Sequence, residues 1–286
     1  MSYPTDPHAA PTCYRHRDRT TYVRCTRCNR PICPECMHDA AVGHQCEDCV
    51  REGTKGVRQP RTVLGGARAK TAPVVTYVLI AINVLLFVIE TVSPGLQRDL
   101  VLFPPAVADG DLYRLVTSAF MHYGIAHLLF NMYALYVIGQ PLEIWLGRLR
   151  FAALYALSAL GGSVLVYLLS PLSAATAGAS GAVFGLFGAS FVVGKRLNLN
   201  VGWVVGLIVI NLAFTFVIPA LGGQAISWQG HIGGLLTGAA VAAAYAYAPG
   251  ERRTLVQVSA TVGLVVLFVV LIWWRTTDLL ARFGIT

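Results

Sequence analysis

GASGAVFGLFG at residues 178–188 and GHIGGLLTG at residues 230–238 are the two stretches that decide the fold of this chain of 286 residues. Both lie inside apolar segments, and glycines in each recur at a spacing of four residues. These glycines are Gly181, Gly185, Gly230, Gly234 and Gly238. Small residues at this spacing allow two helices in a membrane to approach each other closely. The pattern therefore predicts a pair of tightly packed transmembrane helices.

Each stretch also contributes one polar side chain, Ser180 in the first and His231 in the second. Polar side chains within membrane spans are costly and therefore indicate function. His231 shares a helix face with Gly234 and Gly238, so close packing brings it to the partner helix. At 1.5 Å per residue, Ser180 and His231 lie roughly 22–30 Å from the charges that end their segments, in the outer half of the bilayer. We predict that the two side chains can hydrogen-bond to each other.

Seven apolar segments, these two included, approach the roughly 20 residues that a helical span needs. They cover residues 73–92, 115–142, 150–170, 178–194, 201–220, 228–248 and 255–274. Of the whole chain, 55% of residues are hydrophobic and 13% are charged, about half the charged fraction of a soluble domain. A transporter or channel would be expected to have charges in span centres or matched broken helices, and the segments have neither. We predict an all-α polytopic membrane protein.

Basic residues mark alternate breaks between the segments. The breaks after the second, fourth and sixth segments carry arginine or lysine, whereas those after the third and fifth carry none. The basic residues concerned are Arg148, Arg150, Lys195, Arg196, Arg252 and Arg253. The long break after the first segment, which would also lie outside, contains Arg98 and is followed by Arg114. Because basic loops stay in the cytoplasm, we expect the N-terminus to be cytoplasmic and the C-terminus to lie outside.

All seven cysteines lie in the first 49 residues, and with one histidine they form four pairs, each with two intervening residues. The pairs are Cys13 with His16, Cys25 with Cys28, Cys33 with Cys36, and Cys46 with Cys49. The first apolar segment begins too late for a signal peptide, so this region should stay in a reducing compartment, where such pairs bind metal. Eight ligands are enough for two structural zinc ions. Interleaved pairs usually alternate, which assigns the first and third pairs to one ion and the second and fourth to the other.

The cysteine series resembles a B-box-type zinc finger, a family that uses more histidine in its last pair. His44 or His38 could therefore replace a cysteine in the second site. A net charge of +8 raises nucleic acid as a partner. No recognition helix or basic reading surface is evident, however, so we expect a cytosolic protein partner and no nucleic acid. The basic linker that follows either contacts anionic membrane lipids or is merely solvated.

The apolar segments resemble the rhomboid intramembrane serine proteases over nearly all of residues 73–248. The resemblance rests on Tyr113-Arg114, His122-x4-His127-x3-Asn131, Gly139-x3-Glu143-x3-Gly147, Gly178-Ala179-Ser180-Gly181, and Gly230-His231-Ile232-Gly233-Gly234 with the later Gly238. Two positions depart from the family pattern: Tyr113 stands where tryptophan is commoner, and Phe184 where relatives often have tyrosine. Both keep an aromatic ring, so neither departure threatens catalysis.

The resemblance implies a catalytic dyad, with Ser180 as the nucleophile and His231 as the base. A triad is not expected, because no acidic residue lies in the outer half of either span. The resemblance also implies that His127 and Asn131, one turn apart, line the oxyanion hole with the backbone N–H of Ser180. His122 would support hydrogen bonding in the cavity, and no metal is required for catalysis. The other supporting positions are Phe184, Gly178, Gly181, Gly234 and Gly238.

These inferences divide the chain into a zinc-binding domain at 1–50, a basic linker at 51–72, a six-helix rhomboid core at 73–248, and a seventh transmembrane helix with a tail at 249–286. The expected substrates are single-span membrane proteins, cut near the outer end of their transmembrane segment. The expected location is a bacterial cytoplasmic (inner) membrane, with an organellar membrane as the alternative. The alternative function is that of a catalytically silent relative that binds membrane clients. Such relatives typically lose the serine or the histidine, and both are present here.

Overall fold

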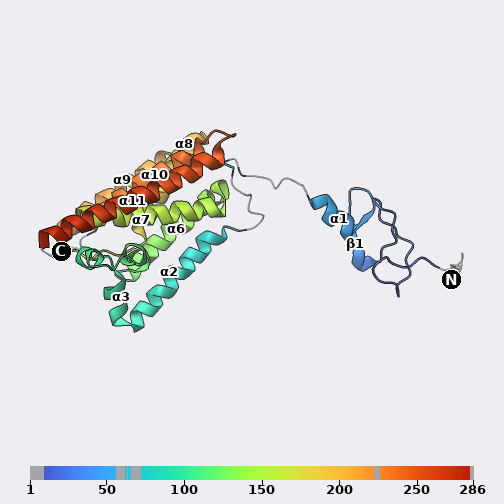
Figure 1. Ribbon diagram of the computed structural model, residues 1–286, viewed down its shortest axis with the longest axis horizontal. Helices are drawn as coiled ribbons and strands as arrows, with labels where there is room; N and C mark the ends of the chain where they lie inside the picture. Colours follow the sequence, from blue (N-terminus) through green and yellow to red (C-terminus); the bar gives the residue numbers. More distant parts are fainter. Residues whose placement is uncertain (1–9, 56–61, 63, 66–71, 222–225, 284–286) are drawn as a thin grey trace. The chain divides into compact units, whose positions relative to one another are not determined.

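The computed structural model describes residues 10–55, 62, 64–65, 72–221 and 226–283. The chain divides into two compact units, Met1–Gln59 and Pro60–Thr286. We call residues 10–55 the head and the described part of the second unit the helical unit. Figure 1 shows the order of the elements within each.

The head contains little regular structure. Its elements are the 3-10 helix Pro34–Cys36 (η1), strands Met37–Asp39 (β1) and His44–Cys46 (β2), and helix Glu47–Thr54 (α1). The two strands are antiparallel, with Met37 opposite Cys46. The buried core of the head consists of six cysteines and Ile32. Because so small a core cannot by itself stabilise a domain, the stability of the head depends on what links these cysteines.

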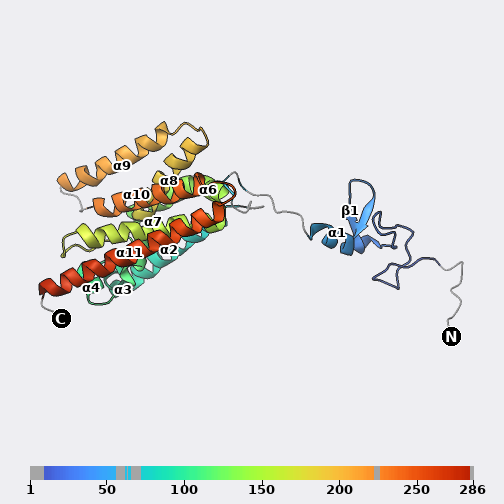
Figure 2. The ribbon, with the colours of Figure 1, turned by 45° about the horizontal axis from the view of Figure 1, so that its top comes forward.

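The regular elements that the structure describes in the second unit are helices (Figures 1 and 2). They are Val74–Val92 (α2), Pro94–Leu100 (α3), Pro104–Ala108 (α4), Arg114–Thr117 (α5), the 3-10 helix Ser118–Phe120 (η2), Ile125–Leu146 (α6), Arg148–Leu169 (α7), Ser180–Arg196 (α8), Gly202–Ala220 (α9), Trp228–Ala246 (α10) and Arg253–Phe283 (α11). Within the described ranges, α2, α6, α7, α9 and α11 are long and apolar enough to cross a membrane. The glycine-rich helices α8 and α10 pack against each other and against α7. The predicted all-α fold, in which α11 follows the six longer helices α2, α6, α7, α8, α9 and α10, is confirmed for the described residues.

The second predicted span begins in the wrong place. We expected a helix over residues 115–142, but α6 runs from Ile125 to Leu146. The residues before it form α5, η2 and a turn that ends at Gly124, whose φ of 117° is outside the helical range. His122 therefore lies in this turn and not in the span. Before α6 the backbone hydrogen bonds close short turns, such as those from Met121 N–H to the Ser118 carbonyl and from Gly124 N–H to the His122 carbonyl, instead of continuing one helix.

Glu143 joins the C-terminal end of α6 to the N-terminal end of α2. Its carboxylate is fully buried in α6 and accepts hydrogen bonds from the backbone N–H groups of Val75 and Thr76, at 3.0 and 2.8 Å, and from the Thr76 hydroxyl at 2.8 Å. The first backbone N–H groups of a helix have no partner within the helix and carry partial positive charge. The carboxylate therefore satisfies the N-terminus of α2 and is itself stabilised there.

The added helix α11 is joined to the rest of the helical unit at both ends. Near its start, Gln257 accepts a hydrogen bond from Arg150 of α7 at 2.7 Å. Near its end, the hydroxyl groups of Thr276 and Tyr167 are 2.8 Å apart. The helix continues nine residues beyond the predicted end at residue 274, and its last part contacts α4 (Figure 2).

Candidate active site and metal sites

Ser180 and His231 come together where α8 and α10 begin. Ser180 is the first residue of α8, and His231 is in the first turn of α10. The Ser180 Oγ lies 3.0 Å from His231 Nε2. Fifty residues separate the two side chains in the sequence, so the contact depends on how the two helices pack.

Glycine makes this close packing possible. A Cβ atom added to Gly234 would collide with the backbone carbonyl of Gly181, and one added to Gly238 would collide with the carbonyl of Gly185. The backbones of α8 and α10 are therefore in direct contact at both levels. Any larger residue at these positions would push the helices apart and separate Ser180 from His231.

The imidazole of His231 is held from two sides. The Phe184 ring, one turn after Ser180, stacks on it with ring centres 4.0 Å apart and an angle of 11° between the planes. At the edge of the ring, His231 Nδ1 is 2.9 Å from the hydroxyl oxygen of Thr215 in α9. We did not single out Thr215 from the sequence, because a threonine in an apolar helix is usually a packing residue.

His127 and Asn131 lie one turn apart in α6, as their spacing predicts. A Cβ added to Gly178, which has a φ of 131°, would lie 2.8 Å from His127 Nε2, so the imidazole sits directly beside the turn that leads into Ser180. Asn131 is buried, and its side-chain amide donates one hydrogen bond to the His127 carbonyl at 2.9 Å. The amide has a second hydrogen that this bond leaves available.

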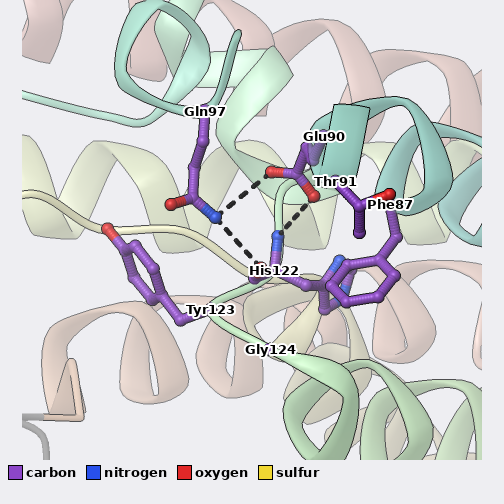
Figure 3. Close-up of a pocket in the computed structure, with 7 residues that line it drawn as sticks. All are labelled: Phe87, Glu90, Thr91, Gln97, His122, Tyr123 and Gly124. Carbon is purple, nitrogen blue, oxygen red and sulfur yellow. Dashed lines mark hydrogen bonds between the residues drawn. The ribbon is translucent and has the colours of Figure 1, made fainter. Parts of the chain in front are cut away.

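His122 borders a cavity of about 400 Å³ (Figure 3). The cavity is lined by Phe87, Glu90, Thr91, Gln97, His122, Tyr123 and Gly124. Glu90, in the last turn of α2, accepts hydrogen bonds from the His122 backbone N–H at 3.3 Å and from the Gln97 amide at 3.4 Å. Gln97 also donates to the His122 carbonyl at 3.0 Å. Glu90 and Gln97 thus hold the backbone of the turn before α6, a role that we did not predict for either.

The His122 side chain is almost fully buried and packs edge-to-face on His127, with ring centres 5.1 Å apart. Its Nδ1 lies 3.3 Å from the Phe120 carbonyl. Its Nε2 is buried and has no hydrogen-bond partner among the described residues. The expected contribution of His122 to hydrogen bonding in the cavity stays a prediction.

Tyr113 and Arg114 organise the loop between α2 and α6. The Arg114 guanidinium pairs with Asp111 at 2.9 Å and donates to the carbonyls of Arg98 and Val101 at 2.9 and 3.1 Å. The Tyr113 hydroxyl donates to Asp111 at 3.2 Å. One arginine therefore joins three separate points of this loop.

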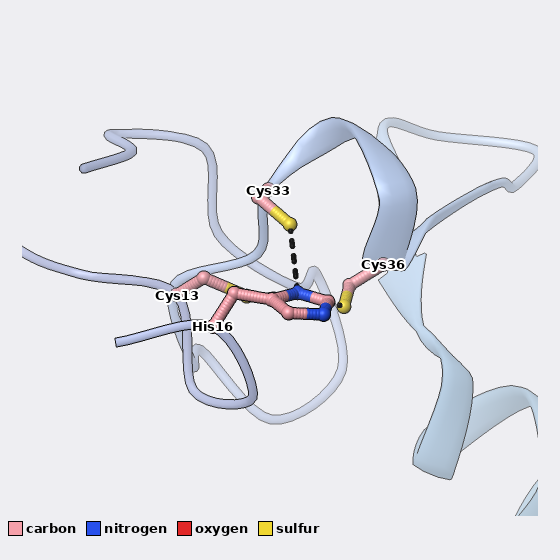
Figure 4. A group of neighbouring side chains, drawn as sticks. All are labelled: Cys13, His16, Cys33 and Cys36. Atoms are coloured by element: carbon pink, nitrogen blue, oxygen red, sulfur yellow. Dashed lines mark hydrogen bonds between the residues drawn. The ribbon is translucent and has the colours of Figure 1, made fainter. Parts of the chain in front are cut away.

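Two groups of potential metal ligands lie in the head, and they follow the alternating assignment. The first contains Cys13, His16, Cys33 and Cys36, and the second contains Cys25, Cys28, Cys46 and Cys49. Figure 4 shows the first group, in which His16 Nδ1 is 3.3 to 3.9 Å from the three sulfur atoms. In the second, the sulfurs of Cys28 and Cys46 are 3.7 Å apart. Ligand atoms 2.3 Å from a tetrahedral zinc would be about 3.8 Å from one another, so the spacing fits such an ion.

The thiols of each group also favour a cation electrostatically. Burial and hydrogen bonding with Cys13 and Cys33 raise the pKa of Cys36 to about 11. In the second group, hydrogen bonding with Cys46 and burial raise the pKa of Cys49 to about 12. Other thiols ionise more readily: although burial opposes it, backbone hydrogen bonds lower the pKa of Cys13 and of Cys25 to about 6. Each group thus contains one thiol that ionises readily and one that does not, and a divalent cation would stabilise both as thiolates because it binds that form.

The suggested replacement of a cysteine by His44 or His38 is not favoured. Neither histidine belongs to the second ligand group. His44 pairs with Asp39 at 3.2 Å, and the His38 side chain is exposed on β1. The second site therefore has four cysteine ligands available within the described head.

Comparison with known proteins agrees with this geometry. The family model described as the rhomboid domain matches residues 109–248. Rhomboid protease GluP of Bacillus subtilis (strain 168) is 36% identical over 183 residues, which are 60% of this chain and 35% of that protein. Putative rhomboid protease YdcA of the same organism is 35% identical over 169 residues, 58% of this chain and 85% of that protein.

A plant relative shows the same likeness. RHOMBOID-like protein 5 of Arabidopsis thaliana is 35% identical over 140 residues, 46% of this chain and 43% of that protein. The chain thus spans about a third of GluP and less than half of the plant relative, but most of YdcA. Its apolar helices and these matches show that it is an integral membrane protein. The chain belongs to the rhomboid family.

Proposed function

We propose that this chain is an intramembrane serine endopeptidase in which Ser180 is the nucleophile and His231 is the general base. The observation that carries the proposal is the distance of 3.0 Å between Ser180 Oγ and His231 Nε2, within the region that matches the rhomboid domain. A serine hydroxyl becomes an effective nucleophile when an adjacent base takes its proton. A neutral imidazole at hydrogen-bond distance can do so near pH 7.

In the proposed reaction, Ser180 Oγ attacks the carbonyl carbon of a substrate peptide bond while its proton passes to His231. The tetrahedral intermediate then collapses, the C–N bond breaks, and the imidazolium gives the proton to the leaving amine. An ester between Ser180 and the substrate remains. Water attacks this ester as His231 takes its proton, and the carboxylic acid product leaves with Ser180 restored.

Three donors would stabilise the negative oxygen of the intermediate. The backbone N–H of Ser180 is at the N-terminus of α8, where it has no partner within the helix and the helix dipole is favourable. The second donor is His127. Its Nδ1 accepts a hydrogen bond from the Tyr123 N–H at 3.4 Å, which favours a proton on Nε2, the nitrogen beside Gly178. The third donor is Asn131, through the side-chain amide hydrogen that is not bonded to the His127 carbonyl. Preorganised donors of this kind typically account for much of the rate enhancement in acyl transfer.

The proposed substrates are single-span membrane proteins that unwind near the outer end of their transmembrane helix, because an intact helix hides its peptide bonds. The alternating basic loops support a cytoplasmic N-terminus and an external C-terminus. The cysteine-rich head together with the GASG stretch at residues 178–181 supports a bacterial cytoplasmic membrane as the setting. In that orientation the head lies in the cytosol, where we propose that it binds a protein partner.

The test is labelling of detergent-purified protein with a fluorophosphonate probe, together with cleavage of a single-span substrate in liposomes. Wild type should be labelled and should cut the substrate at one site, identified by mass spectrometry. Ser180→Ala and His231→Ala should do neither while melting at the wild-type temperature. A folded wild type that is inert in both assays would overturn the proposal and favour a silent client-binding protein.

We also propose that the two ligand groups of the head each bind a structural zinc ion. Three thiolates and an imidazole, or four thiolates, are typical structural zinc sites. Elemental analysis of the purified chain should find two zinc atoms per molecule, and one when Cys33 is replaced by serine. A metal-free head that gives a cooperative melting transition would contradict the proposal.

A further inference from the structure

Thr215 occupies an unusual place in α9. Of the 19 residues of this helix, only Val204 and Thr215 are buried. The remaining side chains are partly or fully exposed on the surface of the helical unit, and Figure 2 shows α9 at its edge. An apolar residue would fill a buried position in a membrane helix at lower cost than a hydroxyl does. The burial of Thr215 therefore calls for a polar partner.

The partners of Thr215 are an imidazole and a carbonyl. Its hydroxyl oxygen is 2.9 Å from His231 Nδ1, and it donates to the Asn211 carbonyl at 2.9 Å. A hydroxyl has one hydrogen and two lone pairs. Since the hydrogen goes to the carbonyl one turn earlier, as is common for threonine in helices, the oxygen is left to accept from His231. We therefore assign the proton of the neutral imidazole to Nδ1.

This assignment has a chemical consequence at the other ring nitrogen. A neutral imidazole with its proton on Nδ1 has a lone pair on Nε2, the atom that lies 3.0 Å from Ser180 Oγ. In serine proteases with a triad, an aspartate fixes this same tautomer and ring orientation. No side-chain carboxylate is hydrogen-bonded to His231 in the part of the chain that the structure describes, so the neutral hydroxyl of Thr215 is in the place of that aspartate.

We propose that Thr215 is a positioning residue that holds His231 in the tautomer able to accept the proton of Ser180. The inference rests on the proposed peptidase function. The hydrogen bonds of the Thr215 hydroxyl in the described structure go to Asn211 and His231 and not to Ser180, so it acts through the imidazole. Its loss should therefore slow the chemical step and leave substrate binding nearly unchanged.

The test compares Thr215→Val with Thr215→Ser in the full-length protein. Valine keeps the shape but removes the hydroxyl, and we expect kcat and the rate of fluorophosphonate labelling to fall on the order of tenfold to a hundredfold. KM should change less than about twofold, because the binding surface is unaltered. Serine restores the hydroxyl and should recover at least about half of the wild-type kcat.

Thr276→Val is the matched control. It removes a hydroxyl contact of 2.8 Å, to Tyr167, that is not part of the dyad, and kcat should stay within about twofold of wild type. A Thr215→Val protein with wild-type kcat would overturn the proposal, as would equal losses in Thr215→Val and Thr215→Ser. If Thr215→Val does not fold, Thr215→Ser is compared with Thr215→Ala, which also lacks the hydroxyl. The kcat of Thr215→Ser should then be severalfold higher, and equal kcat values would overturn the proposal. An inert wild type would instead overturn the peptidase function itself.

Discussion

The head and the helical unit of this protein are held together by different means. The buried core of the head is six cysteines and Ile32, so we expect its folded state to depend on the metal ions proposed for these side chains. The helical unit has an extended apolar core and a pair of helices in backbone contact through Gly181, Gly185, Gly234 and Gly238. The difference teaches that one chain can contain two folding units whose stabilities respond to separate perturbations: ligand chemistry in the head, and residue size in the helical unit.

The largest effect should come from a large side chain between α8 and α10. Gly234→Leu places that side chain against the Gly181 carbonyl, so the helices must separate and Ser180 must lose His231. We expect substrate cleavage to fall at least about a hundredfold. The measurement is cleavage in liposomes with zinc content determined on the same sample, which should stay at two atoms per chain.

Gly206→Leu in α9 is the matched control, because a Cβ there has no neighbour within 4 Å. It should retain activity within about twofold of wild type. Equal losses in the two variants would show that the contact between α8 and α10 is not what the helical unit depends on.

The converse perturbation should affect the head alone. Cys33→Ser removes one ligand of the first group, and we expect the head to lose its zinc at that site and become protease-sensitive. Acidification should have the same effect on the wild type, because protons compete with the metal for thiolates, so zinc is retained at neutral pH and released as pH falls. Limited proteolysis read by mass spectrometry measures the change.

Cleavage of a single-span substrate by Cys33→Ser should stay within about twofold of wild type if the two units are independent. The control for substitutions in the head is His38→Gln, because His38 is exposed and lies outside both ligand groups. A parallel loss of cleavage in Cys33→Ser, absent from His38→Gln, would show that the head influences catalysis and would break the comparison.

A smaller effect is expected at the junction of α2 and α6. Glu143→Gln leaves one oxygen to accept hydrogen bonds but places an N–H donor against the N–H groups of α2. We expect the helical unit to lose about 1–3 kcal/mol of stability, read as a lower melting temperature in detergent. Glu251→Gln alters an exposed acid and should not shift the melting temperature. Equal shifts in the two variants would contradict the role given to Glu143.

The smallest effect is expected at Phe184. Phe184→Tyr keeps the ring that stacks on His231, so activity should change less than about twofold. Phe184→Leu loses the aromatic stack, worth about 0.5–1.5 kcal/mol, and should lower kcat a few-fold. Initial rates of the two variants, normalised to labelled Ser180, distinguish stacking from simple packing. Equal rates would mean that the stack does not matter.

Much of this architecture could be predicted from the sequence. The cysteine pairs, the glycines four residues apart and the alternating basic loops are local patterns, and each has a physical meaning that does not depend on the rest of the chain. The alternation of ligand pairs and the meeting of Ser180 with His231 followed from such spacings. The start of the second span could not be predicted in this way, because apolar composition alone does not distinguish a helix from a series of short turns.

The tertiary structure decided the partners that come from distant segments. Thr215 at His231, Glu143 at the start of α2, and Glu90 at the backbone of His122 each pair one polar group with another that lies far away in the sequence. Seen alone, each residue is a single polar side chain in an apolar stretch. Spacing along a chain determines which residues share a helix face, whereas only the packing of helices determines which faces meet, and a hydrogen bond between faces exists only after they have met.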